Sequence, residues 1–218
     1  MDSNTGLRID SFPLGDWQTN CYVVTRPGSD QCAIFDCGFE PEEMLDWIAA
    51  RKLKPAALVL THAHLDHIGG VDQALSRFGR IPLCIHEAEA EFCGDPMLNL
   101  SAMIGMDTTC TMPDVLLKDD QSITLAGIPF RVLHTPGHSP GGATFVHDAS
   151  AQAIVGDTLF AQSIGRFDFP TSDVKQLRHS IFNVLMKLPD ETRIYPGHGE
   201  QTTIGRERHS NPYILKGF

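Results

Sequence analysis

The feature that most constrains this chain is a short run of metal-ligand side chains, His62-Ala63-His64-Leu65-Asp66-His67. Three imidazoles and one carboxylate fall within six positions, and both groups ligate borderline transition metals such as zinc. The run follows apolar residues 57–60, which predict a buried strand, and precedes residues 71–79, which predict a helix. The ligands therefore occupy a turn at the carboxyl end of a strand, where α/β sheets usually carry their sites.

The alternative interpretation of this run is a polar turn whose histidines are satisfied by their neighbours. A single histidine would favour that alternative, but the spacing His-x-His-x-Asp-His between a strand and a helix favours a metal site. Side chains two positions apart can converge on one ion, and Asp66 and His67 can turn toward a second. Gly69 and Gly70 permit the tight backbone that this requires.

Three more ligand candidates stand just beyond predicted strands later in the chain. His138 follows a strand at 128–133. Asp157 and His198 follow the strands at 153–155 and 193–195. Each has a glycine or proline beside it, which indicates a sharp and specified turn. All three thus repeat the position of the first motif at the end of a strand.

Together these residues predict a centre of two metal ions. The sets are His62, His64 and His138 for the first ion, and Asp66, His67 and His198 for the second. Asp157 is left to bridge them. Two ions about 3.5–4 Å apart with open positions would share a hydroxide, because bound metal lowers the pKa of water toward neutrality.

The order of elements predicts the fold class. The expected strands are at 8–14, 21–25, 33–36, 57–60, 82–85, 122–125, 128–133, 143–147, 153–155 and 193–195, and the expected helices at 41–51, 71–79, 86–92 and 173–188. This order predicts an α/β protein with two sheets face to face and helices outside, a four-layer αββα sandwich. No low-complexity linker divides the chain, so we expect a single domain over residues 1–218.

Charge and composition exclude several classes of partner. The formal net charge of −10 disfavours a nucleic-acid partner, since no block of Lys and Arg offsets it. Residues 1–14 lack the pattern of a signal peptide, and no apolar run approaches the roughly twenty residues of a spanning helix. We therefore expect no membrane partner, a cytoplasmic location, and free thiols at the six cysteines.

Residues 94–114 have no clear periodicity, and four methionines give them a soft apolar character: Met97, Met103, Met106 and Met112. Such residues either fill gaps in a core or form an adaptable wall of a substrate pocket. We expect the first of these roles.

The set His-x-His-x-Asp-His, Pro-Gly-His, Gly-Asp and Gly-His, in that order, resembles the metallo-β-lactamase superfamily over nearly the whole chain from about residue 11. The resemblance implies the αββα fold and places the family's seven metal ligands on the residues named above. Asp157 disfavours true β-lactamase activity, because the lactam-cleaving branch usually carries cysteine or serine there. Residues 163–170 and 202–213 look like the glyoxalase II group, and more closely like its short-chain members.

This resemblance implies a dinuclear hydrolase that cleaves a thioester with metal-bound hydroxide, on S-D-lactoylglutathione or a similar hydroxyacyl thioester. Asp66 and Asp157 would orient the nucleophile and are the expected catalytic residues. The cofactors would be two divalent ions, zinc first, with iron or manganese as alternatives. Longer members add a C-terminal helical region that holds glutathione, and because this chain ends at Phe218, recognition of glutathione is an open question.

Two side chains are candidates for contact with the small-molecule substrate. Arg166 would bind a carboxylate, as would Lys216, although an internal ion pair with Asp168 is an equal alternative for Arg166. Trp17, in the loop between the first two strands, would cover the site.

Other activities of the same superfamily stay open at this point. A persulfide dioxygenase with a single iron would use His62, His138 and Asp157. A lactonase is a further alternative. The sequence predicts no particular oligomeric state.

Overall fold

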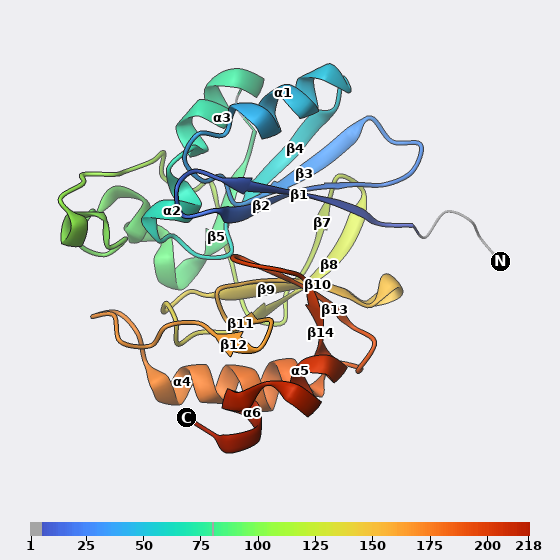
Figure 1. Ribbon diagram of the computed structural model, residues 1–218. Coiled ribbons are helices and arrows are strands. Elements are labelled where there is room, and N and C mark those ends of the chain that lie inside the picture. Colours follow the sequence, from blue (N-terminus) through green and yellow to red (C-terminus); the bar gives the residue numbers. More distant parts are fainter. Residues whose placement is uncertain (1–5, 80) are drawn as a thin grey trace.

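Strands whose residues are buried on both faces require cover on both sides, and the central strands of this chain are of that kind. In β2 (Thr19–Thr25) every residue but the last is buried, and β9 (Ala143–His147) is buried throughout. The computed structural model, which describes residues 6–79 and 81–218, packs two six-stranded sheets face to face with helices on both outer faces (Figure 1). The predicted four-layer αββα sandwich is confirmed.

The first sheet holds the N-terminal strands in sequence order. They are β1 (Arg8–Leu14), β2, β3 (Gln31–Phe35), β4 (Lys54–Val59), β5 (Leu83–His86) and β6 (Val115–Leu117). Strands β3 to β6 run parallel to one another, so the carboxyl ends of β3 and β4 meet at one edge. That edge carries the His-x-His-x-Asp-His run.

The second sheet holds the C-terminal strands. Across the sheet they are β14 (Thr202–Thr203), β13 (Arg193–Pro196), β10 (Gln152–Gly156), β9, β8 (Ile128–His134) and β7 (Ser122–Leu125). Strands β10 and β13 are parallel, so the residues that follow them lie together at one edge. A small separate ribbon pairs β11 (Leu159–Phe160) with β12 (Ser163–Ile164).

Helices cover each outer face (Figure 1). The α-helices are α1 (Glu42–Ala50), α2 (Leu65–Ile68), α3 (Val71–Phe78), α4 (Val174–His179), α5 (Ile204–Ser210) and α6 (Pro212–Lys216). The remaining helical turns are η1 (Glu87–Gly94), η2 (Ser101–Ile104), η3 (Asp148–Ser150), η4 (Ser180–Val184) and η5 (Leu185–Lys187). In Figure 1, α1 and α3 lie outside the first sheet, and α4, α5 and α6 lie outside the second.

Three layers of apolar side chains hold the sandwich together. Between the sheets, Phe35 meets Phe130 and Phe145 edge-on, with ring centroids 5.4 and 5.1 Å apart. Such aromatic pairs stabilise a core beyond the area that they bury. Under the C-terminal helices, Leu177 and Ile181 pack on the second sheet.

Three local predictions are wrong in detail. The single α-helix expected at 173–188 continues after His179 as the π-helical and 3₁₀ turns η4 and η5. The helix expected at 86–92 is the 3₁₀ turn η1. The methionines expected in the core are largely at the surface: Met97 is 68% exposed and Met103 57% exposed.

Residues 1–5 and 80 of the predicted domain 1–218 lie outside the described residues, as does the start of the segment considered for a signal peptide. Within the described part of the chain, every cysteine is a buried free thiol, as expected. None of the helices described is long and apolar enough to cross a membrane.

Candidate metal centre

The first motif occupies the connection between β4 and α3. His62 and His64 precede the short helix α2, and Asp66 and His67 lie on it, so the predicted turn contains one turn of helix. All four side chains are buried. The close i, i+2 and i, i+3 spacings therefore turn four polar groups toward one point at the edge of the first sheet.

A buried carboxylate behind this loop fixes the histidines. Asp36, just past β3, accepts hydrogen bonds from the Thr61 backbone N–H (2.7 Å), the Thr61 hydroxyl (2.7 Å) and His67 Nδ1–H (2.9 Å). His62 Nδ1 lies 3.2 Å from the same hydroxyl, which is thus placed to accept its proton. Both rings are left with Nε2 facing the centre, the arrangement that outer-sphere partners impose on metal-binding histidines.

A second buried carboxylate ties the first motif to the loop that carries His138. Glu89, on η1, accepts hydrogen bonds from the backbone N–H groups of Ala63 (2.7 Å) and Gly141 (2.8 Å). Burial raises the pKa of Glu89, although these hydrogen bonds oppose the shift. The contact fixes two loops that lie far apart in the sequence.

The ligand candidates of the second half are held by backbone groups instead. His138 Nδ1–H donates to the carbonyl of Arg166 (2.9 Å), and His198 Nδ1–H donates to the carbonyl of Trp17 (3.2 Å). The turn before His198 is anchored to β2, because Asn20 Nδ2 and the Tyr22 hydroxyl donate to the carbonyl of Pro196 (3.0 and 2.6 Å).

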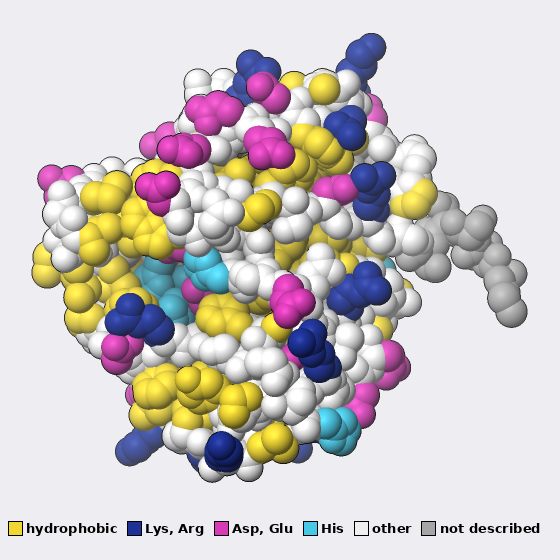
Figure 2. All heavy atoms as spheres, in the orientation of Figure 1, with side chains coloured by type: hydrophobic (Ala, Val, Ile, Leu, Met, Phe, Trp, Pro, Cys, Tyr) yellow, Lys and Arg dark blue, Asp and Glu magenta, His cyan; other side chains and the backbone are white. Residues whose placement is uncertain are grey.

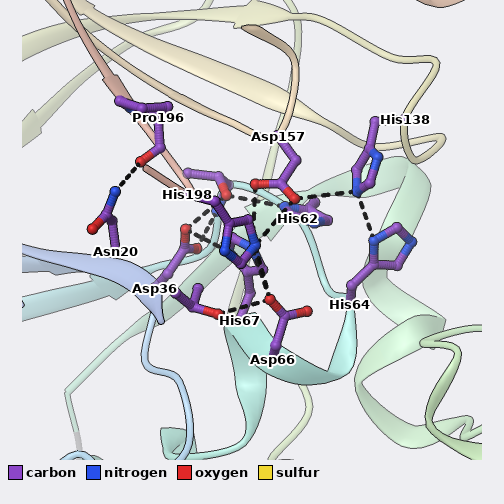
Figure 3. Close-up of polar contacts among 12 residues, drawn as sticks. Asn20, Asp36, His62, His64, Asp66, His67, His138, Asp157, Pro196 and His198 are labelled. Atoms are coloured by element: carbon purple, nitrogen blue, oxygen red, sulfur yellow. Dashed lines mark hydrogen bonds and ion pairs between the residues drawn. The ribbon is translucent and has the colours of Figure 1, made fainter. Parts of the chain in front are cut away.

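The structure brings all seven predicted ligands into one cluster (Figure 3). Potential ligand atoms lie within 4.8 Å of one another in three groups: His62, His64 and His138; His62, His67 and Asp157; and Asp66, His67 and His198. Two of these groups are the sets expected for the two ions.

Asp157 lies between the two sets. Its Oδ2 is 3.5 Å from His138 Nε2 and 3.4 Å from His198 Nε2, and its Oδ1 is 3.5 Å from His67 Nε2. Figure 3 shows the carboxylate between His138 and His198. This is the position that a bridging ligand needs.

The cluster fits a metal centre because it contains buried polar atoms that the protein leaves unsatisfied. Within the described part of the chain, His62 Nε2, His67 Nε2 and Asp157 Oδ1 of the cluster have no hydrogen-bond partner, and His64 Nδ1 and His138 Nε2 face each other at 2.9 Å. Buried polar atoms almost always have a hydrogen-bond partner, so several unpaired atoms in one cluster need an explanation, and a bound metal ion supplies one. Nitrogen and carboxylate donors of this kind suit zinc, iron or manganese.

The pKa values of the histidines are shifted in opposite directions. Burial, and secondarily the neighbouring imidazoles, lower the pKa of His62 and His64 well below the usual range. For His198, burial is outweighed by hydrogen bonds to Asp157 and Asp66, which raise its pKa to about 10. Burial also opposes ionisation of Asp157, but the neighbouring imidazoles of His67 and His198 hold its pKa well below normal.

A cavity of about 550 Å³ opens over the cluster. Trp17 and Arg166 both line it, and Trp17 is 42% exposed. The ion pair that was the alternative role of Arg166 is present: Nε and Nη2 each donate to Asp168 at 2.9 Å. Lys216 is exposed on α6 and is not among the described residues that line the cavity.

Sequence reasoning missed Asp36, Thr61 and Glu89. Asp36 stands at the end of a predicted strand, the position shared by the ligand candidates, and that signal was available. It also adopts a positive φ of 56°, which is costly outside glycine and is often found at functional sites. Glu89 lies in an ordinary helix-forming stretch, and nothing local in the sequence distinguishes it.

Comparison with known proteins identifies the relatives of this chain. A family model described as the metallo-beta-lactamase superfamily matches residues 14–198. Hydroxyacylglutathione hydrolase GloC of Haemophilus influenzae is 34% identical over 210 residues, covering 95% of this chain and 98% of that protein.

Two solved structures are also similar. The BLEG-1 B3 metallo-beta-lactamase is 41% identical with a TM-score of 0.91, covering 95% of this chain and 99% of that one. TTHA1623 in a di-iron-bound form is 36% identical with a TM-score of 0.83, covering 94% and 99%.

Proposed function

We propose that this chain, which belongs to the metallo-beta-lactamase superfamily, is a metal-dependent hydrolase of thioesters of the hydroxyacyl type, with S-D-lactoylglutathione as the test substrate. The observation that carries the proposal is the convergence of seven ligand side chains, six of them buried, among which His62 Nε2, His67 Nε2 and Asp157 Oδ1 have no hydrogen-bond partner among the described residues. The similarity to hydroxyacylglutathione hydrolase GloC supports the choice of thioester over other carbonyl substrates.

Two divalent ions, zinc first, would supply a water nucleophile of lowered pKa and positive charge opposite the acyl oxygen. His62, His64 and His138 would hold one ion. Asp66, His67 and His198 would hold the other, with Asp157 between the two. The di-iron form of TTHA1623 supports a two-ion centre.

The protein's own residues position and desolvate the reacting groups. Asp66 accepts a hydrogen bond from the Thr19 hydroxyl (2.7 Å) and lies 3.1 Å from His198 Nε2, so its carboxylate is held in one orientation. Asp66 and Asp157 are ionised acceptors facing the cavity and can orient the O–H groups of the attacking water. The departing thiolate is far less basic than an amide or an alkoxide, so the site needs no strong proton donor.

The test combines elemental analysis with a thioester assay. We expect purified protein to contain two ions per chain and to hydrolyse S-D-lactoylglutathione. Asp157→Ala should lose metal content and kcat/KM together, by more than the roughly 100-fold that loss of an outer-sphere partner costs. Asp46→Ala, an exposed carboxylate paired with Arg77, is the control and should change neither.

Two results would contradict the proposal. The first is an Asp157→Ala protein with normal turnover. The second is a single iron per chain together with oxygen uptake on glutathione persulfide, which would assign the protein to the dioxygenases.

The similarity to the BLEG-1 B3 metallo-beta-lactamase, which is 41% identical, makes β-lactam hydrolysis a second candidate. The same centre would attack a lactam carbonyl, but the amide nitrogen leaves less readily than a thiolate. We expect nitrocefin hydrolysis to be slower than thioester hydrolysis in the same metal-loaded sample. If nitrocefin is hydrolysed faster than the thioester, the β-lactam is the preferred substrate class.

A further inference from the structure

One wall of the cavity over the metal centre is apolar. It consists of Leu100, Met103 and Ile104, and we call these three residues the apolar wall. They line the same cavity as the ligand candidates His64, Asp66 and His198. Figure 2 shows hydrophobic side chains gathered beside the hollow in which histidines are visible.

The apolar wall is built into the fold. Asn99 is fully buried, and its Nδ2 donates to the carbonyls of Phe92 (3.1 Å) and Thr108 (2.8 Å), which closes the loop at its base. The backbone carbonyl of Asn99 accepts a hydrogen bond from the backbone N–H of Leu65 (3.0 Å), the first residue of α2. The wall is therefore tied directly to the helix that carries Asp66 and His67.

The backbone of the wall is also strained. Leu100 adopts a φ of 71°, a left-handed conformation that is costly for a residue with a Cβ. Strained residues concentrate at binding and catalytic sites, where the surrounding structure holds them in place. Leu100 in this conformation lines the cavity, and η2 begins at the next residue.

Two side chains of the wall are left uncovered. Met103 is 57% exposed and Ile104 is 54% exposed, although both lie beside buried ligands. Large apolar side chains at the rim of a binding cavity gain free energy when a ligand removes them from water. The wall thus favours a substrate with an apolar group close to the thioester.

The charges of the cavity do not match glutathione. Arg166 is the one Lys or Arg among the described residues that line the cavity, and its guanidinium is paired with Asp168 through two hydrogen bonds of 2.9 Å. It also stacks on Phe169 at 4.2 Å. The carboxylates of a glutathione moiety would therefore meet no uncompensated cation from the protein, whereas a neutral thiol half needs none.

We propose that the substrates are thioesters with an aliphatic or aromatic group near the scissile carbonyl and an uncharged thiol half, with the apolar wall as the specificity-determining surface. This inference rests on the thioester hydrolysis proposed above, and it replaces the hydroxyacyl group and the glutathione of the test substrate with an apolar acyl group and an uncharged thiol.

The experiment uses the metal-loaded full chain and two series of thioesters. Acetyl, butanoyl and hexanoyl groups are each joined to N-acetylcysteamine, which is uncharged, and to glutathione. We expect kcat/KM to rise about tenfold from acetyl to hexanoyl, which is the effect of burying roughly two of the added methylene groups against the apolar wall. We also expect each acyl group to react at least as well on N-acetylcysteamine as on glutathione.

Variants locate the effect. In Met103→Gln and Ile104→Ser the ratio of hexanoyl to acetyl kcat/KM should fall toward one. Met112→Gln is the matched control, because Met112 is 52% exposed and is not among the described cavity-lining residues. It should keep the wild-type ratio. Calorimetric binding of the S-hexyl and S-ethyl thioethers of N-acetylcysteamine should show the same pattern without turnover.

The outcomes separate this inference from the proposed function. If thioesters are hydrolysed with no dependence on acyl length, or if glutathione is preferred tenfold and Arg166→Gln abolishes that preference, the inference is wrong and the hydrolase stands. If the metal-loaded protein hydrolyses none of the thioesters, both fail.

Discussion

The two halves of the sandwich position their ligand candidates by different means. In the first half, four ligands come from one loop and are supported by buried side chains, Asp36 and Glu89. In the second half, His138, Asp157 and His198 come from three separate loops and are supported by backbone carbonyls and close backbone packing. The ligands of the first half are therefore oriented mainly by buried carboxylates, and those of the second half mainly by backbone groups and by close packing around Asp157.

Two glycines show how tightly the second half is packed. A Cβ at Gly197 would lie 2.0 Å from Asp157 Oδ1 and 2.8 Å from His67 Cε1. A Cβ at Gly165 would lie 1.8 Å from the backbone oxygen of Asp157. Both distances are far below van der Waals contact, so the residue that bridges the two ligand sets fits only because these positions have no side chain.

The largest effect is expected from Gly197→Ala. The added methyl group must displace the Asp157 carboxylate, which should remove metal from the centre and lower kcat/KM by about 100-fold or more, the upper end for loss of an outer-sphere partner. Metal content, kcat/KM and circular dichroism would be measured together. Gly94→Ala is the control, because its Cβ meets only the Met112 sulfur, at 3.3 Å. Retention of two ions in Gly197→Ala would show that the second half tolerates side chains after all.

A smaller loss is expected from Asp36→Asn in the first half. The amide cannot accept all three hydrogen bonds of the carboxylate, and it removes the negative charge beside His67 Nδ1–H. Outer-sphere changes of this kind cost about 10–100-fold in metal affinity. Affinity would be measured by competition with a chelator, with Asp46→Asn as the exposed control. Unchanged affinity would mean that the loop backbone alone orients His67.

Glu89→Gln probes the connection between the halves. One amide N–H must face a backbone N–H of Ala63 or Gly141, which leaves a buried donor unsatisfied at a cost of about 1–3 kcal/mol. We expect a lower Tm and a loss of metal affinity of about tenfold, the lower end for outer-sphere changes. Glu91→Gln, exposed on the same turn, should alter neither. A Tm loss with normal metal affinity would limit Glu89 to stabilising the fold.

The smallest effect concerns the pH dependence of the metal-free protein. His198 has a pKa raised to about 10, so its stabilising contribution is fully present below pH 6.5 and is lost as pH rises through about 10. His62 has a lowered pKa, so its burial costs stability as pH falls below 6.5.

Chelator-treated variants test this difference. We expect His198→Gln to lower the free energy of unfolding at pH 7 by more than at pH 10.5. We expect His62→Gln to weaken the acid destabilisation of the metal-free chain. Denaturant unfolding across pH would measure both, and parallel curves for the two variants would contradict the assignment.

The ligand candidates of the second half could be predicted from the sequence because the residues that mark them are their immediate neighbours. Gly156 and Gly197 stand next to Asp157 and His198 in the sequence, so ligand and turn were recognised together. Asp36 had the local signal of a strand end, but its role and that of Glu89 depend on contacts with Thr61 and Ala63, which are 25 and 26 residues away in the sequence. A pocket wall was the alternative role considered for the methionines of residues 94–114, but a core role was preferred, since aperiodic methionines do not distinguish a core from a pocket rim.

The sequence by itself determined the layered α/β fold and the ligand set, because strand periodicity and ligand spacing are properties of neighbouring residues. The tertiary structure alone decided that two buried carboxylates, Asp36 and Glu89, hold the loops that carry the ligands. These contacts depend on how strand ends from two sheets meet at one edge. That meeting is set by the packing of the whole core, and no local pattern encodes it.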